Sequence, residues 1–220
     1  GMAFLGFSAG LPFLLVFSTL SAWLRDEGVS RTAIGFFSWV GITYSIKVFW
    51  APIVDRLPLP LLTRRLGQRR GWMLLAQLGI ATGLVGMSLV DPQTSLVAVA
   101  WLALLVAFSS ATQDISIDAY RIEAVQQELQ AAMAATYIFG YRVALLVAGA
   151  GAFYVADFGS WTLAYQVMAA CVGIGMVTTL CIAEPLRRVD RVTEILEDRM
   201  AGAMLGDRAP SRLRHATAWF

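Results

Sequence analysis

The sequence predicts an all-α integral membrane domain with six transmembrane helices arranged as two inverted three-helix repeats. The chain is 58% hydrophobic and only 15% charged. Its mean hydropathy of +0.65 lies well above that of ordinary globular proteins. The apolar residues also gather in runs near the roughly 20 residues that a helix needs to cross about 30 Å of hydrocarbon. These observations predict a chain embedded in a lipid bilayer.

Six such runs follow one another along the chain. The first starts the sequence but has neither the basic region nor the cleavage site of a signal peptide, so we expect it to be a mature span. Residues 1–183 are predicted to form one six-span transmembrane domain, followed by a charged cytoplasmic tail at 184–220. The spans are expected at Met2–Trp23, Ala33–Val54, Gly71–Val90, Ser95–Ile117, Met133–Ala156 and Trp161–Ile182.

Basic residues are distributed unevenly between the two predicted faces. Five arginines lie between spans two and three, one between spans four and five, and seven after span six, which makes thirteen against Arg25 and Arg31 on the other side. Loops rich in basic residues stay in the cytoplasm, so the N-terminus and the tail are predicted on the cytoplasmic side of the inner membrane. Because topology explains the basic segment at 64–70, nucleic acid is not an expected partner.

The tail begins at Glu184 and Pro185 and carries apolar residues at helical spacing between charges. It is predicted either as an amphipathic helix on the inner membrane surface or as a solvated linker helix. Cys171 and Cys181 lie about 15 Å apart along one helix, too far to bond to each other. With His215 alone in the tail, no metal site and no cofactor are expected.

Three features inside the spans concern the arrangement of the helices. Asp55 and Asp157 end spans two and five on opposite faces, which favours two inverted three-helix repeats. Pro12 is predicted to kink span one, either beside a polar cavity or as a harmless bend. A small residue recurs at every fourth position of span five, from Gly140 to Ala156, which predicts close packing of another helix.

Three charged residues lie within the spans: Lys47, Asp114 and Arg142. An ionised carboxylate near lipid tails costs several kcal/mol unless it faces water or a partner, so Asp114 is the first candidate for function. Counted from the cytoplasmic span ends, Lys47 lies roughly 10 Å deep, Arg142 roughly 14 Å and Asp114 roughly 5 Å. Similar depths predict pairing, either in a substrate and proton pathway or as a structural ion pair. Lys47 alternatively reaches the inner interface.

A second group of charges lies at the predicted cytoplasmic ends of the spans, one turn beyond Asp114. We expect Asp55, Arg69 and Asp118 to pair with one another in a gate network on the cytoplasmic side. The alternative is that these side chains are ordinary solvated charges. The members of the predicted network are Asp55, Arg56, Arg69, Arg70, Asp118 and Arg121.

Sequence motifs add a family resemblance. Asp55-Arg56 and Gly67-Gln68-Arg69-Arg70 match, with an insertion between them, the motif that major facilitator proteins carry between spans two and three. The chain also contains GFSAGLPF at 6–13, LSAWLRDEGVSRTAIGFFSWVG at 20–41, WAPIVDRLPLPLL at 50–62 and SATQDISIDAYRIE at 110–123. Together these segments resemble the AmpG-type muropeptide permeases of the major facilitator superfamily, from Gly6 to about Pro185.

The resemblance implies the N-terminal six-helix half of a transporter with twelve to fourteen helices, so this chain would be a fragment or a half. It implies proton-driven import of muropeptides, the N-acetylglucosaminyl-anhydro-N-acetylmuramyl peptides of cell-wall turnover, with a C-terminal six-helix half as partner. It also links one segment of span four to function, which falls on Ala111, Thr112, Gln113 and Asp114. Gln113 is expected to hydrogen-bond sugar or peptide amides in the cavity.

Two other functions remain open. One is a permease for a different bulky anionic solute, because the eukaryotic acetyl-CoA transporters resemble this family. The other is a non-transporting membrane partner that only assembles with another subunit. An enzyme is not expected, because Asp114 and Asp118 alone do not make the cluster of His, Cys or carboxylate groups that catalysis would need.

Overall fold

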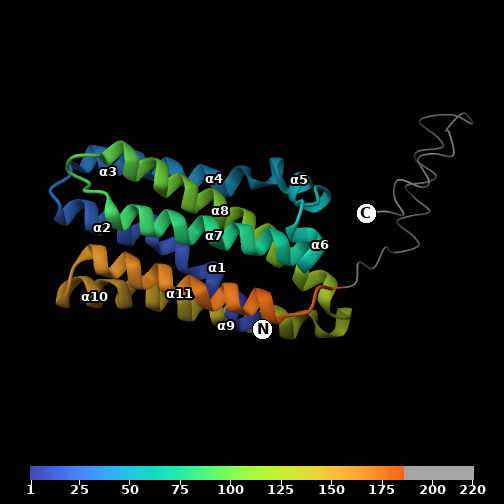
Figure 1. Cartoon of the computed structure of the whole chain (residues 1–220). Helices are drawn as coiled ribbons and strands as arrows, with labels where there is room; N and C mark the ends of the chain where they lie inside the picture. The colour runs from blue at the N-terminus through green and yellow to red at the C-terminus, as the bar shows by residue number, and fades with distance from the viewer. Residues whose placement is uncertain (186–220) are drawn as a thin grey trace, which may run out of the picture. The chain divides into compact units, whose positions relative to one another are not determined.

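A computed structural model describes residues 1–185, which form a bundle of long helices lying along one another (Figure 1). In chain order the helices are α1 (Met2–Val16), α2 (Ser18–Asp26), α3 (Arg31–Phe37), α4 (Ile42–Ser45), α5 (Ala51–Arg56), α6 (Leu62–Leu66), α7 (Gln68–Leu89), α8 (Leu96–Ala124), α9 (Gln130–Leu146), α10 (Ala152–Phe158) and α11 (Trp161–Cys181). The expected surface helix of the tail falls on residues outside this description.

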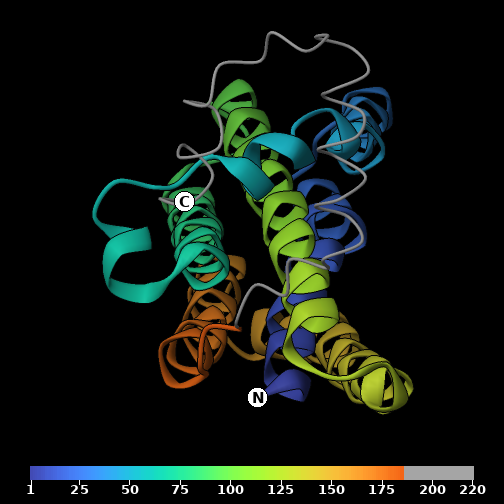
Figure 2. The same ribbon diagram turned by 90° about the vertical axis from the view of Figure 1, so that its right-hand side faces the viewer.

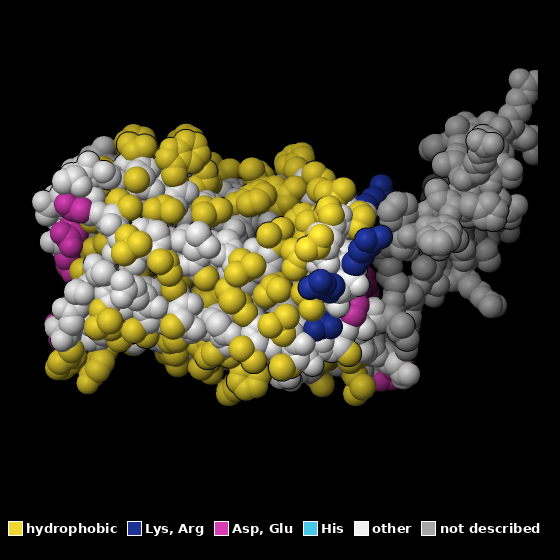
Figure 3. All heavy atoms as spheres, viewed as in Figure 1, with side chains coloured by type: hydrophobic (Ala, Val, Ile, Leu, Met, Phe, Trp, Pro, Cys, Tyr) yellow, Lys and Arg dark blue, Asp and Glu magenta, His cyan; other side chains and the backbone are white. Residues whose placement is uncertain are grey.

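Within the described part of the chain, six helical segments are long and apolar enough to cross a membrane, which confirms the predicted number of spans. Figure 3 shows the corresponding surface: hydrophobic side chains cover the sides of the bundle, and Lys and Arg gather at the end that carries α5 and α6. The segments are Met2–Asp26, Arg31–Phe49, Gln68–Leu89, Leu96–Ala124, Gln127–Phe158 and Trp161–Cys181.

Helix α1 forms the centre of the bundle. It contacts α8, α9 and α11, and the end view shows it among these three helices (Figure 2). Two glycines bring α1 and α9 together, because a Cβ on Gly6 would meet the Tyr137 backbone and a Cβ on Gly140 would meet the Ala3 backbone. Ala144 and Ala148 of the same stripe are fully buried. The prediction that small residues of span five pack against another helix is therefore confirmed.

The break in the first span does not lie at Pro12. Helix α1 continues through Pro12, and the backbone leaves helical geometry at Phe17, where φ is −110° and ψ is −93°. A proline removes one helical hydrogen bond but leaves the neighbouring ones, so the helix can continue past it. Beyond the break, Thr19 Oγ1 donates to the carbonyl of Ala148 over 2.9 Å. That carbonyl belongs to the π-helical turn Val147–Gly151 between α9 and α10.

Two other helix boundaries differ from those expected from the sequence, and both affect segments that carry candidate functional residues. The second span is broken by 3-10 turns at Ser38–Gly41 and Ile46–Phe49, so it runs as several short helices. Helix α8 continues to Ala124, seven residues beyond the predicted end at Ile117. Hydropathy marks only the apolar part of a helix, whereas the hydrogen-bonded helix continues into its polar end. As a result, Asp114 lies ten residues from the end of α8, about 15 Å along the axis rather than 5 Å.

Candidate functional site

Asp114 forms an ion pair with Lys47 inside the bundle. Lys47 comes from the 3-10 turn of the second span, and its Nζ lies 3.8 Å from Asp114 Oδ2. The side chains are 32% and 20% exposed, so the pair is largely removed from the surface. Asp114 Oδ1 is buried and has no hydrogen-bond partner among the described residues. One carboxylate oxygen thus has a cation 3.8 Å away, while the other is buried without a partner, an arrangement that a proton on the carboxyl would satisfy.

Tyrosine side chains of two other spans lie within electrostatic range of this carboxylate. Tyr44, Tyr137 and Tyr141 each interact electrostatically with Asp114, and the buried hydroxyl of Tyr44 also lies beside Ser110. These residues come from three different spans, because α4 supplies Tyr44, α8 supplies Ser110 and α9 supplies the other two tyrosines. The environment combines aromatic surface with hydroxyl groups, which suits an amphipathic ligand.

Thr112 accepts a hydrogen bond from Trp50, an aromatic residue of the second span. Trp50 Nε1 donates to Thr112 Oγ1 over 3.2 Å, and the same hydroxyl donates to the Phe108 carbonyl over 2.8 Å. The rings of Trp50 and Phe108 lie 4.9 Å apart between centroids. Thr112 therefore faces the second span, as Asp114 does, and it fixes the plane of an indole ring.

Gln113 and Ala111 do not face that side. Both are fully buried, and Gln113 Nε2 donates to Ser8 Oγ of α1 over 3.3 Å. Adjacent residues on an α-helix point about 100° apart, so Gln113 turns toward α1 while Asp114 turns toward the second span. The partner of Gln113 Nε2 is thus a buried serine within the bundle. Gln113 Oε1 is buried without a partner among the described residues, and contact of Gln113 with substrate stays a prediction.

Arg142 does not join the pair either. It is exposed on α9 and forms no ion pair with any residue between 1 and 185. Equal depth in the membrane was the basis for expecting it near Asp114, but depth does not determine the direction in which a helix presents a side chain.

The charge network at the other site is organised by three consecutive residues at the start of α7, here called the α7 hub (Gln68, Arg69 and Arg70). Arg69 Nη1 lies 2.5 Å from Asp55 Oδ1, and its Nη2 lies 2.6 Å from Glu123 Oε1. Gln68 Nε2 donates to the Asp55 carbonyl over 2.6 Å. The hub thereby joins the end of α5 to the end of α8.

The α7 hub also joins α7 to α11 through exchanged helix caps. Arg70 donates to the carbonyls of Thr179 and Leu180 at the end of α11, over 2.8 and 2.7 Å. In return, the Glu184 carboxylate accepts from the backbone N–H groups of Arg69 and Arg70 over 2.8 and 3.1 Å. Each helix end thus receives the charge that its unpaired backbone groups favour.

The predicted pairing of Arg69 with Asp118 is wrong. Arg69 instead pairs with Glu123, while Asp118 pairs with Arg121 at 3.2 Å on its own helix. Arg56 is exposed and forms no ion pair within residues 1–185. The sequence reasoning missed Glu123 and Glu184. Both residues lie in segments that the sequence had already marked. Glu123 is the last residue of the SATQDISIDAYRIE segment, and Glu184 directly precedes Pro185, where the tail begins.

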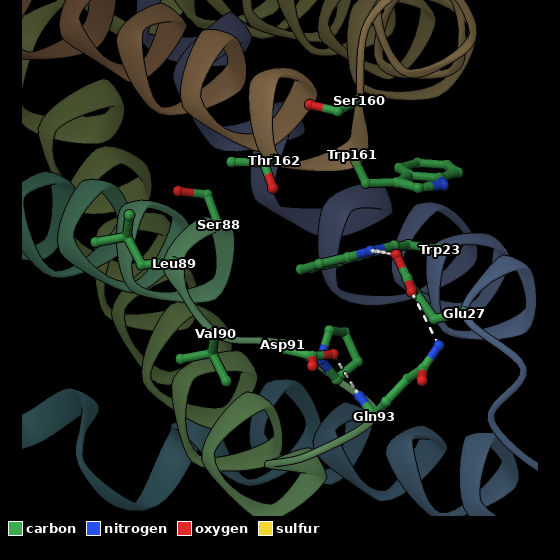
Figure 4. A pocket seen from close by; sticks show the side chains of 11 residues that line it. Trp23, Glu27, Ser88, Leu89, Val90, Asp91, Gln93, Ser160, Trp161 and Thr162 are labelled. Atoms are coloured by element: carbon green, nitrogen blue, oxygen red, sulfur yellow. Dashed lines mark hydrogen bonds between the residues drawn. The ribbon is translucent and has the colours of Figure 1, made fainter.

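A groove of about 450 Å³ lies at the opposite end of α7 (Figure 4). Trp23 Nε1 donates to Glu27 over 3.3 Å there, and Gln93 reaches the second oxygen of the same carboxylate over 3.4 Å. Asp91 and Trp161 also line it. None of the residues predicted to be functional lies in this groove, which separates it from the Lys47–Asp114 site.

Comparison with known proteins identifies the family. The model of the Major Facilitator Superfamily matches residues 2–215. A protein of Rickettsia conorii named as AmpG 4 transporter is 37% identical over 82% of this chain and 44% of its own length. The anhydromuropeptide permease of Escherichia coli K12 is 39% identical over 82% of this chain and 36% of its own length. The chain thus spans less than half the length of these relatives.

The Major Facilitator Superfamily is a family of transporters, not of enzymes, and the six apolar helices of the described residues make the chain a multi-pass membrane protein. The expected resemblance to AmpG transporters is confirmed as well. The family match over residues 2–215 and these relatives show that the chain belongs to the Major Facilitator Superfamily.

Proposed function

We propose that this chain is the N-terminal half of a proton-coupled importer of muropeptides, and that Asp114 is its proton-carrying group. The observation that carries the proposal is the Lys47–Asp114 pair within the spans, whose charged atoms lie 3.8 Å apart and which leaves the buried Asp114 Oδ1 without a partner among residues 1–185. The substrate class comes from the printed name of the Escherichia coli relative, an anhydromuropeptide permease.

A loosely paired carboxyl suits proton coupling for a physical reason. Burial favours its neutral form, whereas a nearby ammonium group favours its charged form. A small change in the Lys47–Asp114 separation between outward- and inward-facing states shifts this balance, so that a proton binds on one side and leaves on the other. A tight bidentate pair would stay ionised in both states.

A second six-helix half is proposed to cover the least buried spans. Only 17% of the apolar window of Arg31–Phe49 and 22% of that of Gln127–Phe158 are buried, against 61% for the first span. Figure 1 shows these two segments, α3–α5 and α9–α10, along opposite edges of the bundle. Lys47 lies on one and Tyr141 on the other, so the partner half would close a cavity around Asp114. The two halves of each six-helix unit would be inverted repeats.

The α7 hub is proposed to act as a gate at the cytoplasmic end. It ties the ends of α5, α7, α8 and α11 in the conformation described here, and we assign this conformation to the outward-facing state, in which the cytoplasmic side is closed. Opening toward the cytoplasm would require part of this network to separate.

The orientation has a direct test in a background with Cys171 and Cys181 replaced by serine. Ser160→Cys, in the turn before α11, should react with a membrane-impermeant thiol reagent added outside intact cells. Gln126→Cys, in the turn after α8, should react only after the membrane is permeabilised. The reverse pattern would overturn the proposed cytoplasmic N-terminus.

The transport proposal is tested with the complete transporter in membrane vesicles and labelled anhydromuropeptide, with acetyl-CoA as the competing candidate. We expect accumulation of the muropeptide that depends on an inward proton gradient. Asp114→Asn keeps the size and hydrogen-bonding capacity but cannot titrate, so it should still exchange labelled for unlabelled substrate while losing accumulation. Asp118→Asn, one turn away at the surface, is the matched control and should keep both.

Normal gradient-driven accumulation in Asp114→Asn would remove Asp114 as the proton site. Uptake of acetyl-CoA but not of muropeptide would replace the proposed substrate.

A further inference from the structure

Trp50 differs from the exposed tryptophans Trp39 and Trp101 of the transmembrane region. Trp39 and Trp101 are each 68% exposed and make no hydrogen bond to any residue in 1–185, as expected for side chains in contact with lipid. Trp50 is half-buried, and its indole N–H donates a hydrogen bond to Thr112 Oγ1 of α8. A tryptophan that anchors a helix at the membrane surface directs this N–H to water or headgroups instead.

The plane of the Trp50 ring is fixed at two points. Thr112 holds the nitrogen edge, and Phe108 lies against the ring with its plane inclined by 34°. The Thr112 hydroxyl is itself fixed, because it donates to the Phe108 carbonyl. A side chain with so little remaining freedom offers a preorganised flat surface, and a ligand that stacks on it loses less entropy on binding.

The Lys47–Asp114 ion pair joins the same two segments of the chain as the Trp50–Thr112 hydrogen bond. Lys47 precedes Trp50 by three residues, one helical turn, and Asp114 follows Thr112 by two residues on α8. The Lys47 ammonium is a hydrogen-bond donor, and the buried Oδ1 of Asp114, which has no partner among residues 1–185, is an acceptor. The second span and α8 therefore supply both the flat aromatic surface of Trp50 and the charged Lys47–Asp114 pair.

We infer that Trp50 is the platform on which a pyranose ring of the substrate stacks, with the Lys47–Asp114 pair binding polar substituents at the edge of that ring. A pyranose has a face of C–H groups that packs on an aromatic ring and a rim of hydroxyl and acetamido groups that needs hydrogen-bond partners. A bare peptide lacks that face. The inference rests on the proposed muropeptide transport and assigns the sugar part of the substrate to this position. Thr112 acts as a positioning residue for Trp50.

The first test measures uptake kinetics of labelled anhydromuropeptide by the complete transporter. Trp50→Leu should raise KM by about tenfold or more, the size expected for loss of one aromatic stacking contact and its buried area. Trp50→Tyr keeps a stacking ring and should change KM far less. Trp39→Leu is the matched control, because it removes an exposed tryptophan from the same span without touching the site.

The class of ligand is tested by competition. Inhibition of uptake by the peptide-free disaccharide should weaken in Trp50→Leu, whereas inhibition by the sugar-free peptide should stay as in the wild type. Equal weakening for both inhibitors would overturn the assignment of the sugar to Trp50. So would an unchanged KM in Trp50→Leu at normal protein levels.

A second test separates positioning from a structural role of Thr112. Thr112→Val keeps the shape but removes the acceptor for the indole N–H, so it should raise KM by about threefold, the scale of one hydrogen bond. In a Trp50→Phe background the ring has no N–H that could donate to Thr112, so Thr112→Val should leave KM unaltered. An equal rise in both backgrounds would contradict the positioning role.

The failure of this inference is distinguishable from failure of the proposed function. A wild-type transporter that does not take up anhydromuropeptide overturns both. A wild type that transports it while Trp50→Leu keeps a normal KM overturns the platform alone.

Discussion

The two charged sites of this chain differ in how completely their groups are satisfied. In the α7 hub, Arg69 is held by Asp55 and Glu123 at 2.5 and 2.6 Å, and the neighbouring backbone is capped by Glu184. At the other site, Lys47 and Asp114 are 3.8 Å apart and one carboxylate oxygen has no partner in residues 1–185. Saturated contacts hold helix ends in place, whereas an unsaturated pair leaves room for a ligand or a proton. The comparison predicts stability effects at the hub and transport effects at the pair.

The largest stability effect is expected for Arg69→Ala. The Arg69 side chain is 9% exposed, and its loss removes the cation that lies between the carboxylates of Asp55 and Glu123. We expect a loss of about 3 kcal/mol in the free energy of unfolding, as for other broken, largely buried ion pairs. Denaturation of the purified protein in detergent measures it, with the exposed Arg56→Ala as control. A loss no greater than that of the control would contradict the role of the hub.

Charge exchange tests which residue of α8 is the partner. Glu123→Arg should impair folding and transport, and adding Arg69→Glu should restore part of both, because the opposite charges face each other again. Full recovery is not expected, since Asp55 would then repel the new glutamate. Asp118→Arg with Arg69→Glu is the matched control and should show no recovery. Recovery with Asp118 rather than Glu123 would refute the observed pairing.

A smaller effect is expected for Glu184→Gln. The carboxylate caps the N–H groups of Arg69 and Arg70, and a neutral amide keeps one acceptor but loses the favourable charge at the helix start. The expected loss is about 1 kcal/mol in unfolding free energy. The exposed Glu128→Gln should change stability by less than half as much. Equal effects of the two variants would show that the cap contributes nothing specific.

The smallest stability effect is expected for Lys47→Met, which separates the two sites most sharply. A partly exposed pair at 3.8 Å contributes less than about 1 kcal/mol, so unfolding should hardly change. Proton-driven accumulation should nevertheless fall, because Asp114 loses the charge that opposes its neutral form. Measuring denaturation and accumulation on the same preparation tests the contrast. A large stability loss with normal transport would reverse the roles given to the two sites.

The features of the fold that depend on local composition could be predicted well from the sequence. The spans were recognisable because each must be apolar over a bilayer's thickness, and the stripe from Gly140 to Ala156 predicted close packing because only small residues let backbones touch. The end of α8 was less predictable. Its last seven residues include Asp118, Arg121 and Glu123, and hydropathy does not detect a helix that continues past the apolar segment.

Partners in the candidate site were less predictable, because a side chain's direction depends on helical phase as well as depth. Glu123 lies five residues beyond Asp118, which turns it about 140° around the helix axis. Nothing in the sequence states which of these directions faces α7. The same reasoning explains why Gln113 meets Ser8 while its neighbour Asp114 meets Lys47.

The sequence by itself therefore determined the number of spans, the uneven distribution of arginines and the family resemblance, all of which follow from residue type and order along one chain. Only the tertiary structure decided that Glu123 and Glu184 complete the α7 hub, that Trp50 rests on Thr112, and that Arg142 stands apart from Asp114. The contacts made by Glu123, Glu184 and Trp50 join residues between 54 and 115 positions apart. Such distances are closed only when helices pack at a particular rotation about their axes, and packing is a property of all the helices together.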